Sequence, residues 1–154
     1  MALHFSKQEF SERKRKVLQS MKEQNLDAIL MFRQESMYWL TGYDTFGYVF
    51  FQTLVLDNKG NIILLTRAPD LRQAQNTSDI EDIRIWVDKD GSNPADDLKD
   101  ILDELSLKGK KVGIEYEAYG LTGRNALRLN KSLENYCNIE DQSELITKIR
   151  VVKS

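Results

Sequence analysis

The chain has 154 residues, a length that favours one domain of ordinary size. Hydrophobic residues make up 41% and charged residues 30%, a globular balance that excludes a collagen-like or wholly disordered chain. The formal charge of −2 gives no overall electrostatic reason to expect a nucleic acid or a membrane as a partner. We therefore expect a soluble, cytoplasmic domain.

Helical and strand patterns alternate along the chain. Ser6 and Glu9 have the spacing of a capping box, so the first helix is expected to begin at Ser6. Gly42 suits the left-handed position after the second helix, and Pro94 suits the first turn of the fourth. The six expected helices cover residues 6–25, 34–40, 69–75, 94–105, 121–133 and 143–149.

Strands are expected where β-branched and aliphatic residues cluster between turn signals. The Asn58-Lys-Gly60 turn predicts an antiparallel hairpin between two of them. Another segment alternates Ile83, Ile85 and Val87 with polar residues and Trp86, which predicts a half-exposed strand with its register fixed by that alternation. The six expected strands cover residues 27–32, 49–56, 61–66, 80–87, 111–114 and 136–139. This order predicts a single α/β domain, with a mixed sheet of five or six strands flanked by helices.

Several patterns that can carry chemistry have a simpler structural explanation. Gly42 and Gly47 have no third glycine or Lys-Ser/Thr ending, so they do not form a phosphate-binding loop. The basic run at residues 13–16 is expected to be the solvated face of a helix. The acidic residues of the helix at 94–105 diverge in the same way, whereas a divalent metal needs converging oxygens.

Two further candidates involve Glu115, Glu117 and Cys137. The two glutamates flank Tyr116 at a strand end and share a side; a paired acid–base role is conceivable, but a structural or rim role is favoured. Cys137 is expected to be a small buried hydrophobic residue. His4, the one histidine, precedes the first helix, so neither a Cys-His nucleophile nor a His/Cys metal site is expected.

Residues 38–48 concentrate aromatic side chains around two glycines. Core packing is expected for Tyr38, Trp39 and Leu40. The next part of the segment is equally compatible with core packing and with recognition on a loop, where amphipathic aromatic rings are common. Its candidate residues are Tyr43, Asp44, Phe46 and Tyr48.

A second polar cluster, Arg67 and Asp70, comes directly after the hairpin. An arginine at this position could hold a carboxylate, or it could pair with Asp70. Both alternatives are open from the residues alone.

The segment Tyr38-Trp-Leu-Thr-Gly42-Tyr43 resembles the Tyr-x-x-(Thr/Ser)-Gly-(Phe/Tyr/Trp) signature of the N-terminal domain of creatinases, prolidases and Xaa-Pro aminopeptidases. The opening helix, the hairpin and the Val112-Gly-Ile-Glu115 strand occur in the same order. The ending Arg150-Val-Val-Lys-Ser154 is similar to the Arg-x-x-Lys-Ser element that precedes the catalytic domain of this family. The resemblance covers nearly all of the chain.

The resemblance implies that residues 1–154 form an N-terminal domain with a ribonuclease H-like layout. In this family two divalent metals, ligated by Asp, His and Glu, lie in a C-terminal domain of the pita-bread fold, which this chain does not include. The resemblance therefore implies a metal-dependent parent hydrolase acting on a small peptide or amide, whose own catalytic domain is the first partner of this chain. The chain alone is expected to hold no cofactor and to be inactive.

The resemblance also implies a homodimer in which a loop after the signature reaches the substrate site of the partner subunit. By position this loop carries Tyr43, Asp44, Phe46 and Tyr48, with Arg67 and Asp70 supporting it or touching the substrate.

The substrate class is narrowed by one departure from the family pattern. Creatinase has a Phe-Gly-Arg triplet where this chain has Tyr48, Val49 and Phe50, which argues against creatine as substrate. Xaa-Pro dipeptidase-like or ectoine hydrolase-like members are the better match. The alternative is a standalone α/β module that binds a small ligand through residues 43–48.

Overall fold

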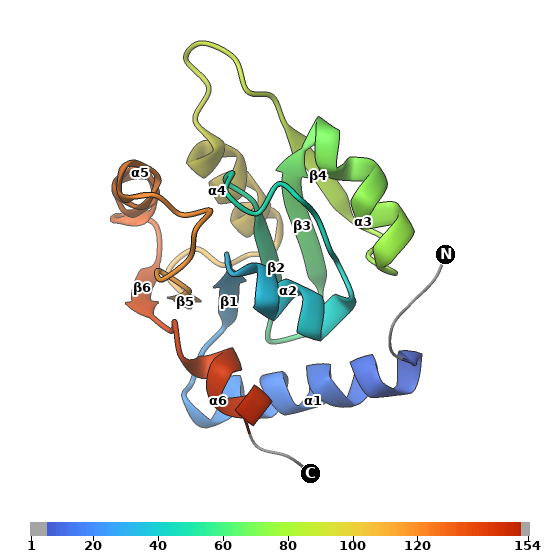
Figure 1. The fold of residues 1–154 in the computed structure, drawn as a ribbon. Helices are drawn as coiled ribbons and strands as arrows, with labels where there is room; N and C mark the ends of the chain where they lie inside the picture. The colour runs from blue at the N-terminus through green and yellow to red at the C-terminus, as the bar shows by residue number, and fades with distance from the viewer. Residues whose placement is uncertain (1–5, 152–154) are drawn as a thin grey trace.

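The computed structural model describes residues 6–151, so His4, Lys153 and Ser154 lie outside the described residues. Helices and strands alternate as the sequence predicts (Figure 1). The helices are α1 (Lys7–Glu23), α2 (Gln34–Thr41), α3 (Leu71–Thr77), α4 (Pro94–Glu104), α5 (Gly123–Leu133) and α6 (Leu145–Val151). The strands are β1 (Ala28–Met31), β2 (Thr53–Asp57), β3 (Ile62–Arg67), β4 (Ile83–Trp86), β5 (Lys111–Ile114) and β6 (Asn138–Asp141), with a 3-10 turn at Ala68–Asp70.

One six-stranded sheet has the strand order β4-β3-β2-β1-β5-β6. β2 pairs antiparallel with both β1 and β3, which confirms the predicted hairpin. The remaining pairs, β3 with β4, β1 with β5 and β5 with β6, are parallel. The sheet is therefore mixed, and the predicted α/β domain is confirmed.

Helices cover both faces of this sheet, and β1 at its centre is buried on each side. Successive side chains of a strand point to opposite faces. Ala28 and Leu30 of β1 accordingly join one hydrophobic cluster, under α4 and α5. Ile29 and Met31 join the other, under α1, α2, α3 and α6. Within residues 6–151, none of these helices is both long and apolar enough to cross a bilayer.

The predicted helix ends agree with the local chemistry. The Ser6 hydroxyl accepts a hydrogen bond from the Glu9 amide at 3.1 Å, as in the predicted capping box. Gly42 comes after α2 with φ = 85°, a left-handed conformation that glycine adopts at low cost. Of the three residues expected in the core before it, Leu40 is fully buried, whereas Tyr38 and Trp39 are half-buried.

The predicted start of the second strand was wrong. β2 begins at Thr53 rather than at residue 49, because residues 47–50 form a turn in which the Phe50 amide donates to the Gly47 carbonyl. In β4 the buried side chain is Trp86, whose indole N–H donates to the Phe51 carbonyl at 2.9 Å. Ile85 and Val87 are exposed, so the strand is half-exposed, as predicted. The indole ring of Trp86 packs into the core while its N–H keeps a hydrogen-bond partner.

Candidate functional site

The candidate residues from the sequence lie at one edge of the sheet. The carboxyl ends of the parallel strands β1, β5 and β6 meet at this edge. Since β2 is antiparallel to β1 and β3, the amino end of β2 and the carboxyl end of β3 lie there as well. Ligands of α/β proteins commonly bind beyond the carboxyl ends of strands. The loops at this edge therefore define the candidate site.

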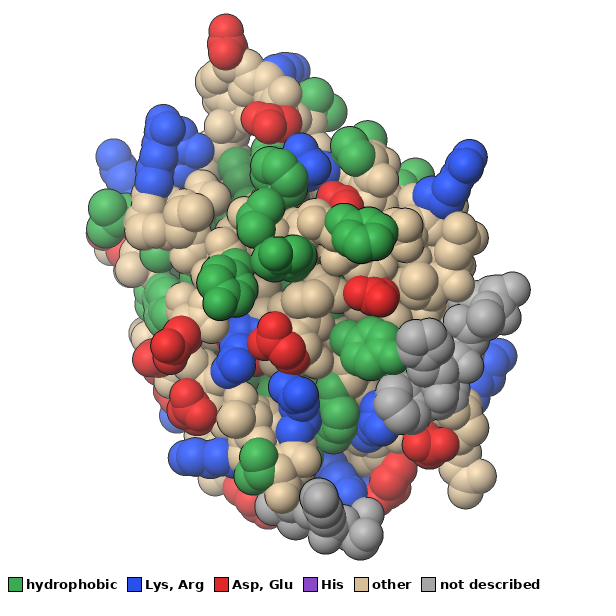
Figure 2. Space-filling view, viewed as in Figure 1, with side chains coloured by type: hydrophobic (Ala, Val, Ile, Leu, Met, Phe, Trp, Pro, Cys, Tyr) green, Lys and Arg blue, Asp and Glu red, His purple; other side chains and the backbone are tan. Residues whose placement is uncertain are grey.

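In the segment between α2 and β2, buried and exposed residues alternate from 43 to 48, and residues 49 and 50 are exposed as well. Asp44, Phe46 and Tyr48 point outward, and the Phe46 ring is 90% exposed. An exposed apolar surface, which we call the aromatic patch, is formed by Phe46, Tyr48, Val49 and Phe50 together with Tyr119 of the β5–α5 segment. Figure 2 shows hydrophobic side chains gathered on this face, in the region where the α2–β2 segment crosses in Figure 1. Such a concentration of exposed rings marks an interaction surface.

Tyr43, the first residue of this segment, is fully buried and belongs to the domain's own core. Its hydroxyl donates to Gln52 Oε1 at 2.5 Å, and Thr66 donates to the same oxygen at 3.1 Å. The amide of Gln52 in turn donates to the Gly47 carbonyl at 3.0 Å. Burial raises the pKa of Tyr43 to about 12, so the phenol stays neutral. Tyr43 and Gln52 thus hold the loop from beneath, and no sequence pattern singled out Gln52.

Arg67 and Asp70 lie under the same loop. Asp70 Oδ1 accepts a hydrogen bond from the Thr45 hydroxyl at 2.6 Å, and its other oxygen is 3.8 Å from Arg67 Nε. The Arg67 guanidinium lies over the Phe50 ring, 3.6 Å from its centre, a cation–π contact. A Cβ at position 47 would lie 2.5 Å from the Asp70 carboxylate, so a side chain there would displace Asp70 from its contact with Thr45. Arg67 lies within ion-pair distance of Asp70, with no hydrogen bond between its Nε and that carboxylate oxygen.

The β5–α5 segment supports the aromatic patch from the other side. The rings of Tyr48 and Tyr119 meet edge to face, with centroids 6.1 Å apart. Gly120 lies directly against the loop backbone, because a Cβ at this position would be 2.6 Å from the Phe50 carbonyl oxygen. The loop is thus fixed by β5–α5 as well as by β2 and β3.

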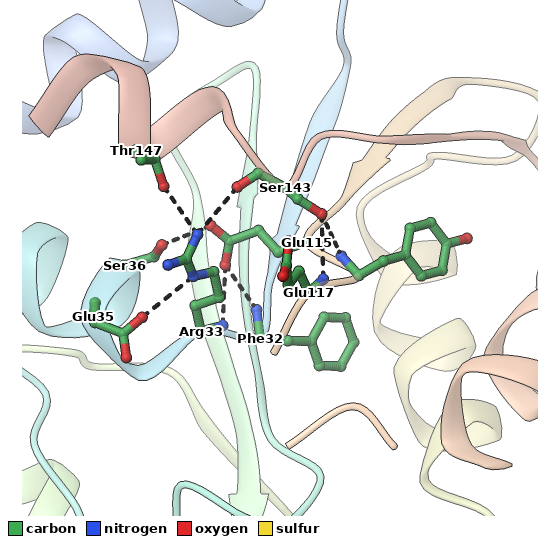
Figure 3. A network of polar contacts seen from close by, with 9 residues as sticks. Phe32, Arg33, Glu35, Ser36, Glu115, Glu117, Ser143 and Thr147 are labelled. Carbon is green, nitrogen blue, oxygen red and sulfur yellow. Dashed lines mark hydrogen bonds and ion pairs between the residues drawn. The ribbon is translucent and has the colours of Figure 1, made fainter. Parts of the chain in front are cut away.

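Glu115, the first residue after β5, is completely buried at the same edge (Figure 3). One carboxylate oxygen accepts hydrogen bonds from the Phe32 and Arg33 amides at 3.1 and 3.0 Å, and the other accepts from the Ser36 hydroxyl at 2.6 Å. Glu117, two residues further along, is exposed, so the two glutamates do not form an acid–base pair. The structural role favoured for Glu115 fits this geometry.

The pKa of the Glu115 carboxyl is raised to about 7 by burial. The hydrogen bonds from Ser36 and the two amides, together with the charge of Arg33, act in the opposite direction but do not compensate. A carboxyl group inside a domain that titrates near neutrality is unusual outside functional sites. The sequence signal of Glu115, a glutamate directly after an apolar strand, is too common to identify this residue as a special one.

Arg33 and Ser143 extend this arrangement to the end of β6 (Figure 3). The Arg33 guanidinium donates to the Thr147 hydroxyl at 3.0 Å and to a carboxylate oxygen of Glu35 at 3.2 Å. The Ser143 hydroxyl accepts from the Tyr116 and Glu117 amides and donates to Asp141. We call these residues the Glu115 network; its members are Phe32, Arg33, Glu35, Ser36, Glu115, Tyr116, Glu117, Asp141, Ser143 and Thr147.

A cavity of about 530 Å³ lies between the Glu115 network and the aromatic patch. Phe32 and Arg33 line one part of it, and Glu117, Tyr48 and Tyr119 line another. The two regions therefore share a single hollow at the sheet edge. Neither at this cavity nor anywhere else among residues 6–151 is a group of three or more His, Cys, Asp or Glu side chains arranged to hold a metal ion.

Comparison with known proteins identifies the family of this chain. A family model of the creatinase/prolidase N-terminal domain matches residues 13–152. The chain belongs to this family. The resemblance drawn from the signature at residues 38–43 is therefore confirmed.

Two curated relatives match this creatinase/prolidase N-terminal domain along its whole length. An uncharacterized hydrolase/peptidase, y4tM of Sinorhizobium fredii, is 28% identical over 99% of the chain, and the ectoine hydrolase of Halomonas elongata is 26% identical over all of it. The chain spans 40% of the length of each relative. The fold is also that of a solved dipeptidase from Pyrococcus horikoshii OT3, with a TM-score of 0.73 and 22% identity over 92% of this chain and 37% of that one.

Proposed function

We propose that this chain is the non-catalytic N-terminal domain of a metal-dependent Xaa-Pro dipeptidase or creatinase-like amidohydrolase. It would support a homodimer and shape the substrate site of the partner subunit. Membership of the creatinase/prolidase N-terminal family supports this proposal, as does a chain spanning 40% of relatives named hydrolase/peptidase and ectoine hydrolase. A small peptide or amide is the substrate class that we propose on the basis of these names.

The observation that carries the proposal is the exposed aromatic patch, which buried polar side chains hold in place from beneath. Metal-activated water attacks many substrates, so selectivity has to come from the walls around it. Tyrosine and phenylalanine provide large apolar contact area with little loss of rotamer entropy. A patch held from beneath by hydrogen bonds is therefore suited to close a substrate site.

The residues of the loop divide into two roles. Asp44, Phe46 and Tyr48 would face the partner subunit, with Asp44 placed to bind a substrate amine through a charge-assisted hydrogen bond. Arg67 and Asp70 would support the loop, as their contacts with Phe50 and Thr45 suggest. Tyr43 joins this supporting group in our proposal, because its ring is buried and does not line a surface.

The divalent metals of this family belong, in this proposal, to the catalytic domain that would come after the chain. The described residues do not fit such a site, since they bring no group of three His, Cys, Asp or Glu side chains together. This domain would contribute contacts and shape to the reaction, not metal ligands. A cytoplasmic location is part of the same proposal, and a sequence with a single cysteine supports it.

Substituting Asp44 tests the proposed role directly in the protein that carries the catalytic domain. Asp44→Ala is expected to lower kcat/KM for an Xaa-Pro dipeptide or ectoine at least tenfold, with the thermal midpoint nearly unchanged, because Asp44 is exposed. Glu23→Ala is the matched control, since Glu23 is exposed just before the amino end of β1, at the opposite edge. A several-degree loss of midpoint with intact kinetics would show that Asp44 is structural instead.

A second candidate, a standalone module that binds a small ligand, is favoured by the 530 Å³ cavity beside the loop. The gene sequence beyond codon 154 separates the two candidates. A reading frame that continues into a domain with Asp, His and Glu ligands supports the first candidate, and a stop codon supports the second.

A further inference from the structure

Three turns, from β1 to α2, from β5 toward α5 and from β6 to α6, meet at the Glu115 network. We propose that Glu115 is a proton-titrating positioning residue, which accepts three hydrogen bonds from the β1–α2 turn when it is ionised and rearranges these bonds when it takes up a proton. The cavity between the network and the aromatic patch would then change its wall with pH. This inference concerns the present chain and does not depend on the proposed function.

The contacts of Glu115 identify the turn that it positions. Phe32 and Arg33 come directly after β1, and their amides both donate to one Glu115 oxygen. Ser36, in the first turn of α2, donates to the other oxygen. One buried side chain from β5 therefore satisfies three donors of a turn 79–83 residues away in sequence. Arg33, the N-cap residue of α2, makes no side-chain capping bond, and its own amide is one of the donors that Glu115 accepts.

The charged groups around Glu115 are few. Among residues 6–151, Arg33 is the one cation whose charge acts on the Glu115 carboxyl, and it is itself paired with Glu35 on α2. On the β5 and β6 sides the charged groups are Glu117 and Glu144, which are exposed, and Asp141, which accepts from Ser143. Ionised Glu115 is thus compensated by a single shared arginine, and this favours proton uptake by the buried carboxyl.

Proton uptake would change the bonds in a defined way. The ionised carboxylate only accepts, and its bonds with the amides are charge-assisted. Once protonated, the oxygen facing Ser36 becomes a donor, so the Ser36 oxygen has to accept instead. The amides of Phe32 and Arg33 then bond to a neutral carbonyl, and the Arg33 guanidinium loses its buried counter-charge. Both changes reach the cavity, because Phe32 and Arg33 line it.

Backbone amide shifts of the 154-residue chain, recorded by NMR between pH 5 and 9, test this inference. We expect the Phe32 and Arg33 amides to titrate together with a midpoint near 7, where burial places the pKa of Glu115. Glu115→Gln should keep the fold but abolish this titration. Glu23→Gln, at an exposed site at the opposite edge of the sheet, should leave it unchanged.

Two results would overturn the inference: flat amide shifts from pH 5.5 to 8.5, or the same titration in Glu115→Gln. If that variant does not fold, the carboxyl carbons of the wild-type chain decide instead. One buried glutamate should then titrate near pH 7, and a set of glutamates all titrating below pH 5 contradicts the proposal. A purely structural Glu115 would give neither pH profile.

Discussion

The aromatic patch and the Glu115 network lie at the same edge of the sheet and are built in opposite ways. The loop carrying the patch exposes large rings to solvent and buries small polar groups such as Thr45 beneath them. The network buries a carboxylate and surrounds it with amides and a hydroxyl. Rings in water favour contact with another molecule, whereas a buried charge favours order within the domain.

This difference explains why the two regions respond differently to substitution. Exposed residues of the loop make few contacts inside the domain, so changes there should affect recognition more than folding. Residues that hold the loop or the turn satisfy buried polar groups, so their loss costs stability. The largest losses of stability are therefore expected at buried side chains, and the smallest at exposed ones.

Within the loop, the inward and outward aromatic residues should differ most. Tyr43→Ala is expected to lower the free energy of unfolding by about 4 kcal/mol, because it removes a fully buried ring. Tyr43→Phe should cost only about 1 kcal/mol, for the lost hydrogen bond to Gln52. Phe46→Ala should stay within about 0.5 kcal/mol of wild type. Urea unfolding measures all three. Equal losses of stability in Tyr43→Ala and Phe46→Ala would contradict the distinction between inward and outward aromatic residues.

The pH dependence of the free energy of unfolding should reflect the titration of Glu115. Its pKa is about 7 in the folded chain against an ordinary value of 4.5, so the folded state binds the proton more tightly. The stabilisation from this group is therefore complete below pH 4.5 and is lost as the pH rises through 7. By this shift, wild type should lose about 3 kcal/mol relative to Glu115→Gln over that interval. A constant difference between the two proteins from pH 4.5 to 8 would contradict the assignment.

Two glycines of the β5–α5 region should respond in opposite directions. Gly120→Ala places a Cβ 2.6 Å from the Phe50 carbonyl oxygen, so the loop backbone has to move, and we expect a loss of about 2 kcal/mol. Gly123→Ala meets nothing within 4 Å among the described residues and should be neutral or stabilise by about 0.5 kcal/mol. Unfolding midpoints measure both. An unchanged midpoint in Gly120→Ala would show that β5–α5 does not support the patch.

Local features of the fold were predictable from the sequence. The turn at residues 58–60 predicts the β2–β3 hairpin, and Ser6 predicts the start of α1, because both signals act within a few residues. The burial of Trp86 in β4 was not predictable from alternation alone. Trp86 reaches the carbonyl of Phe51, a partner that alternation within the strand does not reveal.

In the candidate site, too, local features were predictable and long-range contacts were not. Composition identified the aromatic loop, since rings beside glycines are visible in the sequence itself. The partners of Glu115 are backbone amides 82 and 83 residues away, and an amide leaves no trace in a sequence. Gln52 was missed for a similar reason, because its role depends on the position of Tyr43 and Thr66 around it. Burial and long-range pairing, not residue type, decide these roles.

Activity of mixed dimers tests most directly whether the aromatic patch acts on the partner subunit. One subunit would carry Phe46→Ala and Tyr48→Ala with an intact catalytic domain, and the other an intact loop with a catalytic domain inactivated at its metal ligands. If the loop acts across the dimer, the intact catalytic domain receives an intact loop. The mixed dimer should then have half the wild-type activity per dimer, with wild-type KM. Activity as low as that of the homodimer with both loops substituted would contradict the account.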